Sequence, residues 1–189
     1  MPSDGALAWY LASSSLRPGK SSFGDGMKLS IITTPFNSDQ KAKLHGWEFA
    51  VQHSFWDTGF GVILNYTIVN GDAKYDNTLP WNVSQFALIG LSDSANAVLF
   101  YDKNGLQARV AYNWRDEFLA GTGSNPTYIE KYGQVDASAS YEFQKGLTVF
   151  FEVINLTGEG RRGHRRSDRN VTFATPGDAR WSGGLRFTF

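Results

Sequence analysis

Hydrophobic and polar residues alternate with a period of two along much of the chain. Near the C-terminus, Trp181, Leu185 and Phe187 fall on one set of positions, and Arg186 and Thr188 on the other. This period places alternate side chains on opposite faces of a β-strand. The other segments with the same pattern span 47–55, 60–68, 94–102, 106–115, 135–143 and 147–154. The pattern therefore predicts strands with one apolar and one polar face.

Short turns join these segments into three antiparallel hairpins, at 56–59, 102–105 and 144–146. The second turn contains an Asn-Gly pair, which is a strong hairpin signal. A weaker strand over 27–36 brings the total to about eight. No stretch after Met27 sustains an apolar period of 3.6, so we expect no long helix there. A short helix over residues 4–16 is compatible with the sequence.

Long polar segments, at about 71–92, 120–133 and 158–179, alternate with the short turns. Outer-membrane β-barrels have this asymmetry, with tight turns at one end and long extracellular loops at the other. Aromatic residues near strand ends, such as Trp56 and Trp114, suit the interfacial girdle of such a barrel. A soluble β-sandwich that uses its aromatic residues in a closed core remains the alternative.

Composition narrows the function classes. Aromatic residues make up 15% of the 189 residues, and 20 are glycines, which favours strands and turns. Equal numbers of basic and acidic residues, 18 each, disfavour nucleic-acid binding. The chain has no cysteine, and His45, His53 and His164 share no metal-ligand spacing. No carboxylate pair accompanies a nucleophile. We therefore expect no enzyme activity, catalytic residue, metal or cofactor.

The two strand faces have separate predicted roles. In a barrel the apolar set faces lipid: Phe60, Val62, Leu64, Tyr66, Val110, Tyr112, Tyr141, Val149, Phe151 and Leu185. The polar set, with Ser138 and Asp136 beside it, lines the lumen: Glu48, Asn65, Arg109, Asn113, Arg115, Glu142, Glu152 and Arg186. Pairing across the sheet or hydration of the lumen wall explains these charges better than catalysis.

The long segments hold the candidate ligand contacts. A basic run that includes His164 and Arg169 lies in the last long segment, and its guanidinium groups suit phosphate or carboxylate recognition. A solvated loop that meets anionic lipopolysaccharide is the simpler interpretation. Aromatic loop residues could stack on a ligand or simply pack the loops. The ligand-binding candidates are Tyr75, Trp81, Tyr128, Arg161, Arg162, Arg165 and Arg166.

Several motifs, in fixed order, resemble the barrel of TonB-dependent outer-membrane receptors. Residues 44–49 and 60–67 resemble the "GvE... NYT" region, and 94–96 with 108–115 resemble the "SAN... aRlaYnyR" hairpin. Residues 136–141 and 153–157 are similar to the penultimate hairpin with its "NLT" ending, and 184–189 to the closing strand. The resemblance covers about residues 27–189, with 1–26 expected to be a loop or irregular segment.

The resemblance implies an antiparallel transmembrane β-barrel of about 22 strands with an N-terminal plug that contacts TonB. A chain of this length supplies about eight spanning strands, so we interpret it as the C-terminal part of the barrel, with Met1 at a truncated start. Whether these strands close on themselves is left open. The implied function is uptake of ferric siderophores, cobalamin or other large nutrients in the bacterial outer membrane of Gram-negative cells, with TonB reached only through the missing plug. A passive structural barrel without transport is the alternative.

The C-terminal strand carries a second expected role. Trp181, Leu185, Phe187 and Phe189 alternate up to the last residue and resemble the signal by which barrel assembly machinery recognises its clients. An edge strand with free backbone groups can be captured by strand addition. In the simpler interpretation, Phe189 is only the last lipid-facing aromatic residue. The expected partners are thus membrane lipid, lipopolysaccharide and the assembly machinery.

Overall fold

The computed structural model describes Trp9, Tyr10, Phe36, Asn37 and residues 39–188. The chain divides into two compact units, Met1–Lys41 and Ala42–Phe189. In the first unit, β1 (Trp9–Tyr10) pairs antiparallel with β2 (Phe36–Asn37). The short helix over 4–16 is wrong at Trp9 and Tyr10, which form β1. The rest of that segment, the predicted boundary between residues 26 and 27 and most of the weak strand over 27–36 lie outside the described residues.

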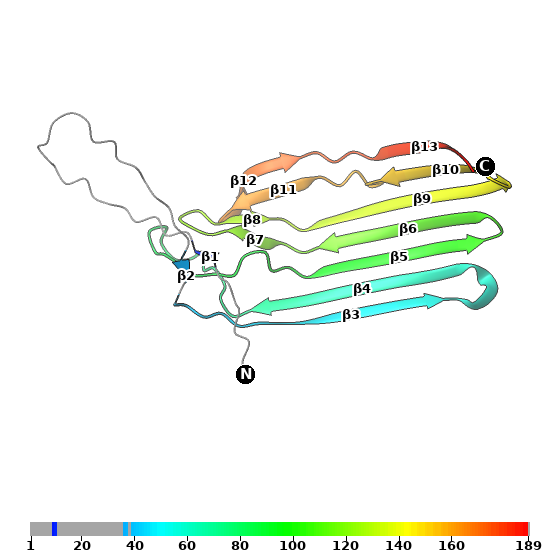
Figure 1. The fold of residues 1–189 in the computed structure, drawn as a ribbon. Coiled ribbons are helices and arrows are strands. Elements are labelled where there is room, and N and C mark those ends of the chain that lie inside the picture. The colour runs from blue at the N-terminus through cyan, green and yellow to red at the C-terminus, as the bar shows by residue number, and fades with distance from the viewer. Residues whose placement is uncertain (1–8, 11–35, 38, 189) are drawn as a thin grey trace, which may run out of the picture. The chain divides into compact units, whose positions relative to one another are not determined.

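Seven strands of the second unit form one antiparallel sheet, in the order β13-β10-β9-β6-β5-β4-β3 (Figure 1). All three predicted hairpins are present in it, and each strand pairs with its predicted neighbour. The strands are β3 (Leu44–Ser54), β4 (Phe60–Gly71), β5 (Ser94–Lys103), β6 (Leu106–Arg115), β9 (Tyr132–Gln144), β10 (Leu147–Ile154) and β13 (Arg180–Phe187).

Local backbone chemistry explains the tight turns. Asn104 and Gly105 have φ angles of 55° and 77°, which is the two-residue turn that an Asn-Gly pair favours. Gly59 has φ 86° after the single 3-10 turn of Trp56–Thr58, the only helical element among the described residues. The prediction of an all-β chain without long helices is therefore confirmed. No helix in the described part of the chain is long and apolar enough to cross a membrane.

A second sheet of four strands, three of them short, lies where loops were predicted (Figure 1). Its order is β12-β11-β8-β7, from β7 (Phe118–Gly121), β8 (Thr127–Ile129), β11 (Arg161–Arg165) and β12 (Ser167–Thr175). The segments 120–133 and 158–179, expected as long polar loops, thus contain ordered strands. These segments continue the hairpins of the main sheet, so β7, β8, β11 and β12 repeat the order of β6, β9, β10 and β13. Only the 72–93 segment is a loop throughout.

The break between the two sheets has a specific cause at Asn155, which is 8% exposed and has φ 57°. Its backbone N–H donates to Asp136 Oδ1 at 2.9 Å. Its side chain donates to the Glu159 carbonyl at 3.0 Å and accepts from the Glu159 N–H at 2.9 Å. This left-handed residue ends β10, and its amide holds the turn that leads into β11.

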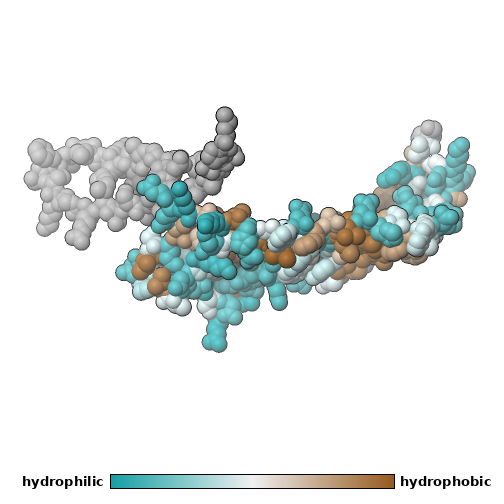
Figure 2. Space-filling model, turned by 90° about the horizontal axis from the view of Figure 1, so that it is seen from below, coloured by the Kyte–Doolittle hydropathy of each residue, from teal (hydrophilic) through white to brown (hydrophobic). Residues whose placement is uncertain are grey.

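The predicted apolar set shares one face of the seven-stranded sheet. Val62, Leu99 and Val110 lie directly opposite one another on neighbouring strands, and the pairing continues to the edges. All members of the set except the half-buried Val62 are exposed: Val110 is 48% accessible and Leu185 58%. Figure 2 shows apolar surface gathered over the strands, between more hydrophilic regions at the two ends. No second layer of the described residues covers this face, so the closed core of a β-sandwich is absent.

The seven-stranded sheet is open, with β3 and β13 at its edges. Every neighbouring pair is antiparallel, so the first and seventh strands run in the same direction. Joining β3 directly to β13 would therefore create a parallel seam. An antiparallel wall that includes these strands needs an odd number of further strands between the two edges, in line with the even strand counts of bacterial outer-membrane barrels.

Candidate functional site

The polar face of the main sheet carries a continuous row of amide side chains at one level. Asn65 donates to Asn96 Oδ1 at 3.5 Å, and Asn96 donates to Asn113 Oδ1 at 2.5 Å. Gln134 lies directly opposite Asn113 and donates to Asp136 Oδ1 at 2.6 Å. Directly opposite residues share a face, so four strands present one row of amides there.

Charged side chains border a cavity of about 360 Å³ on the same face. Arg109, Glu152 and Arg186 line it together with Ser138. Glu152 Oε2 accepts a hydrogen bond from Ser182 at 3.3 Å, and the Arg186 guanidinium lies 5.9 Å from the centre of a phenylalanine ring. The charged side chains around this cavity form no close ion pair with one another, which is typical of a hydrated surface.

Three other predicted lumen residues occupy different positions on that face. Glu142 accepts a hydrogen bond from the Gly146 N–H at 2.9 Å, so it caps the β9–β10 turn. Glu48 lies on the exposed edge strand β3, opposite Thr67. Arg115 is at the last position of β6, where its guanidinium lies 4.0 Å from the ring centre of Phe118.

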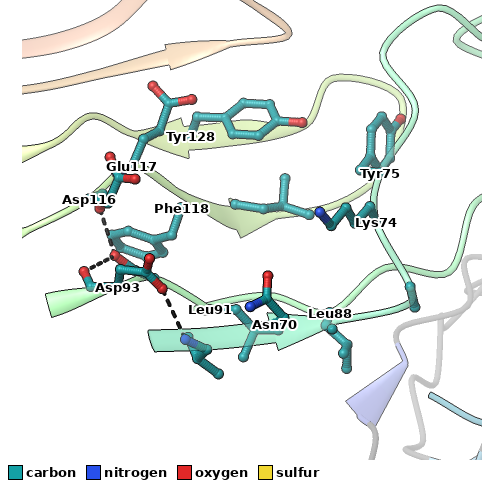
Figure 3. Close-up of a pocket in the computed structure, with 15 residues that line it drawn as sticks. Asn70, Lys74, Tyr75, Leu88, Leu91, Asp93, Asp116, Glu117, Phe118 and Tyr128 are labelled. Carbon is teal, nitrogen blue, oxygen red and sulfur yellow. Dashed lines mark hydrogen bonds between the residues drawn. The ribbon is translucent and has the colours of Figure 1, made fainter. Parts of the chain in front are cut away.

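The loop over residues 72–93 and the β7–β8 hairpin enclose a cavity of about 370 Å³ (Figure 3). Tyr75 and Tyr128 both line it, as does Lys74. The Tyr75 hydroxyl donates to the Gly123 carbonyl at 2.7 Å, and Asn77 donates to the Tyr128 hydroxyl at 3.0 Å. Two of the predicted aromatic candidates are thus brought together, and both also hold loops in place.

Burial raises the pKa of the Tyr128 phenol, more than the hydrogen bond from Asn77 lowers it. Tyr75 and Glu117 raise this pKa further, and Arg166 lowers it. Tyr128 therefore stays a neutral phenol at physiological pH and can donate a hydrogen bond. Outside the cavity, Trp81 is 69% exposed, so the structure does not place it with the two tyrosines.

Arg166 connects three loop segments through backbone carbonyls. Its guanidinium donates to the carbonyls of Asn77 at 3.0 Å, Leu79 at 2.8 Å and Ser124 at 3.2 Å. It adopts φ 54°, in the left-handed region, which is uncommon for a residue other than glycine. This arginine joins the 72–93 loop to the two long hairpins, which run from β6 to β9 and from β10 to β13. Its N–H groups are thus used to hold the loops together.

His164, on β11, is 5% exposed and lies between the two long hairpins. Its Nδ1 is 3.3 Å from Glu130 Oε1 and 4.0 Å from Glu117 Oε2, and its ring stacks on Tyr128 at 5.2 Å between centres. Glu130 Oε2 also pairs with Arg162 at 3.3 Å. Sequence reasoning noted His164 in the basic run and among the histidines without metal-ligand spacing. It missed both glutamates, because their partners are more than 30 residues away.

Arg161 and Arg165 differ in environment although they share one strand. The Arg161 guanidinium lies 5.0 Å from the ring centre of Tyr132 and lines a third cavity, with Arg115 and Arg162. Arg165 is exposed and lines none of the three cavities described here. The arginines of the basic run therefore differ in role. Arg161 and Arg162 line a cavity, Arg166 links loop segments, and Arg165 faces solvent.

Residues 10–156 match the family model described as TonB dependent receptor-like, beta-barrel. This match covers most of the chain and ends just after β10. No curated protein and no solved structure gives a significant match. The fold and its uncovered apolar face place the chain in the class of outer-membrane transport barrels. It belongs to the TonB dependent receptor-like β-barrel family.

Proposed function

We propose that the chain forms a sector of the wall through which an outer-membrane transporter imports a ferric siderophore, cobalamin or another large nutrient in Gram-negative bacteria. The exposed apolar face, continuous over seven strands, carries this proposal, because a transmembrane barrel turns such an alternating apolar surface toward lipid. The opposite face, with its amide row and Arg109, Glu152 and Arg186, lines the wet interior. TonB acts through a plug domain and makes no direct contact with these strands.

Tryptophan fluorescence tests the orientation of the wall. The 72–93 loop and the four-stranded sheet together are called the loop layer. Single-tryptophan variants of the full chain, folded into lipid vesicles, report on Trp47 and Trp181 of the apolar face and on Trp81 of the loop layer. Brominated lipid is expected to quench Trp47 and Trp181, and aqueous iodide to quench Trp81. Equal access of iodide to all three would contradict a lipid-facing wall.

Uptake tests the transport role. Gram-negative cells that express this sector within a complete receptor, with a plug and the remaining strands of the wall, are expected to accumulate labelled ferric siderophore or cobalamin above cells with an empty vector. Arg109→Glu should change that uptake, while membrane insertion, followed by protease protection, stays unaltered. Uptake that is indifferent to this charge reversal would favour a passive barrel.

The C-terminal strand supports a further part of the proposal, recognition by barrel assembly machinery. Trp181, Leu185 and Phe187 are 58%, 58% and 60% exposed and alternate along the free edge strand β13, while Phe189 lies outside the described residues. A free edge permits strand addition, with alternate side chains seated in pockets. Phe187→Asp should sharply reduce assembly in cells and barely affect refolding in detergent. If assembly and refolding fall together, Phe187 only packs against lipid.

A further inference from the structure

Two arginines of different hairpins line one cavity, and neither has an acidic partner among the described residues. The cavity, of about 620 Å³, lies where β6 and β9 pass into the four-stranded sheet. Its polar side chains include Arg115, Arg161, Arg162 and Glu130. Glu130 is engaged by Arg162 at 3.3 Å and by His164 at 3.3 Å. Within the described residues, no carboxylate lies within ion-pair distance of Arg115 or Arg161.

Aromatic rings hold both guanidinium groups from one side. Arg115 lies 4.0 Å from the ring centre of Phe118, and Arg161 lies 5.0 Å from that of Tyr132. A cation over an aromatic face is stabilised without use of its N–H donors, which lie in the guanidinium plane. Neither side chain donates a hydrogen bond within the described part of the chain. Two oriented guanidinium groups therefore keep their donors available.

The remaining lining residues complete a binding site of mixed character. Ile129, Tyr132 and Phe173 supply apolar and aromatic surface, and Thr175 supplies a hydroxyl group. The volume falls in the range of sites for small organic ligands. A guanidinium pairs best with planar carboxylate or phosphate oxygens, to which it donates two parallel hydrogen bonds.

The cavity belongs to the polar face of the wall. Arg115 and Tyr132 are direct partners in the β6–β9 register, two positions beyond the Asn113–Gln134 pair of the amide row. Because strand side chains alternate, both pairs lie on the face opposite to the exposed apolar set. A phosphate group of lipopolysaccharide, anchored at the lipid side, does not reach this face, whereas a soluble anion does.

We propose, building on the transport function above, that this cavity binds a soluble organic anion with at least two carboxylate or phosphate groups. Arg115 and Arg161 each bind one acidic group, and the aromatic and apolar residues contact the carbon skeleton of the ligand. Arg162 is neutralised by Glu130 and contributes mainly to the shape of the site. The anion is part of the imported nutrient.

Calorimetry with citrate and pyrophosphate as probes tests the site, on the full chain folded in detergent at low ionic strength. One saturable site is expected, with a dissociation constant below about 1 mM. Arg115→Gln and Arg161→Gln should each weaken binding about tenfold, because each removes a charge-assisted hydrogen-bond pair. The lysine variants of both positions should bind with intermediate affinity, because they keep the charge and lose the planar fork.

Arg165→Gln and Arg169→Gln are the matched controls, since each removes one positive charge from the same hairpin outside the cavity. They should change affinity less than about twofold. Equal weakening by the controls would show a diffuse charge effect and overturn the proposal. So would an absence of citrate or pyrophosphate binding by a chain whose circular dichroism shows the native strand content.

Vesicles that contain lipid A distinguish the two sources of anionic groups. Lipid A is expected not to compete with citrate, and displacement of citrate by lipid A would overturn the assignment to a soluble anion. The outcome is separable from that of the transport proposal. A chain that passes the tryptophan test but binds no anion refutes the cavity alone, whereas one that binds anions but makes no lipid contact refutes the wall alone.

Discussion

The seven-stranded and four-stranded sheets share two long hairpins, which run from β6 to β9 and from β10 to β13, but depend on different surroundings. In the main sheet the backbone ladders are long and regular, and large apolar side chains such as Phe49 and Leu99 remain half exposed. In the smaller sheet the strands are short and their register shifts, yet His164 and Leu119 are buried. In the proposed membrane wall, lipid covers the apolar face of the first sheet, whereas side chains of the protein itself hold the second sheet together.

This difference explains why one hairpin can pass through both regions. In a membrane every backbone group must be paired within the protein, which the regular ladders achieve, while side chains need no protein partner. Above the membrane, water competes for backbone groups. Side chains such as Arg166 and Asn155 therefore stabilise the loops through hydrogen bonds to backbone carbonyls and N–H groups.

Substitution of adjacent residues on β9 gives the largest expected contrast between the faces. Ala139→Arg places a charge on the exposed apolar face near the middle of the strand, and should cost about 2–4 kcal/mol of stability in lipid vesicles. Ser140→Arg, on the polar face, should cost less than about 1 kcal/mol. Urea unfolding of both variants in vesicles measures the difference. Equal losses would mean that the two faces meet the same environment.

Loss of the Arg166 connections should affect only the loop layer. Arg166→Ala removes three charge-assisted hydrogen bonds and should lower the free energy of local opening by about 2 kcal/mol. Hydrogen exchange of peptides from 72–93 should then accelerate, while β4 and β5 keep their protection. Arg165→Ala, beside it in the sequence, serves as the control and should leave exchange unchanged. Faster exchange in the main sheet as well would show that the two regions are not separate in stability.

The strand pattern made the main sheet predictable, because a period of two and an Asn-Gly turn are local signals. Register followed from the same alternation, since a slip by one residue would exchange the faces. The extension of the hairpins into β7, β8, β11 and β12 was not predictable. β7, β8 and β11 are three to five residues long, too short for a clear alternation, and β12 is polar at most of its positions. The stability of this sheet depends on contacts between distant segments, as between Glu130 and His164.

The candidate site was only partly accessible from sequence, for a related reason. Residue type identified Arg161 and Tyr128 as suited to ligand contact. It could not separate Arg166, which bonds three carbonyls, from Arg165, which faces solvent, because both have the same chemistry and adjacent positions. Arg115 was assigned to the lumen wall, yet the break after β6 brings it to the same cavity as Arg161.

Glu130 offers a smaller test of the contacts between the two long hairpins. Glu130→Gln removes its charge and weakens its pairing with Arg162, whose side chain is 45% exposed. The loss should be about 1 kcal/mol or less, because exposed ion pairs contribute little. Cysteines introduced at 127 and 165, which are direct partners in the β8–β11 register, would report separation of the hairpins through the rate of disulfide formation in a chain without native cysteine. A slower rate in Glu130→Gln than in Glu142→Gln, at the opposite end of the sheet, is the expected result.

The smallest expected effect is a pH dependence confined to the loop layer. Because burial raises the pKa of Tyr128, the folded loop layer binds the phenol proton more tightly than the unfolded chain does. The stability gained in this way is complete below the ordinary tyrosine pKa of 10.0, and it is lost as the pH rises through the raised value. Near-ultraviolet circular dichroism should therefore lose the signal of the Tyr128–His164 stack above about pH 10, while the far-ultraviolet strand signal persists. Tyr128→Phe should abolish this transition, and Tyr141→Phe, on the apolar face of the main sheet, should retain it. If both sheets lost their structure at the same pH, the loop layer would not titrate as a separate unit.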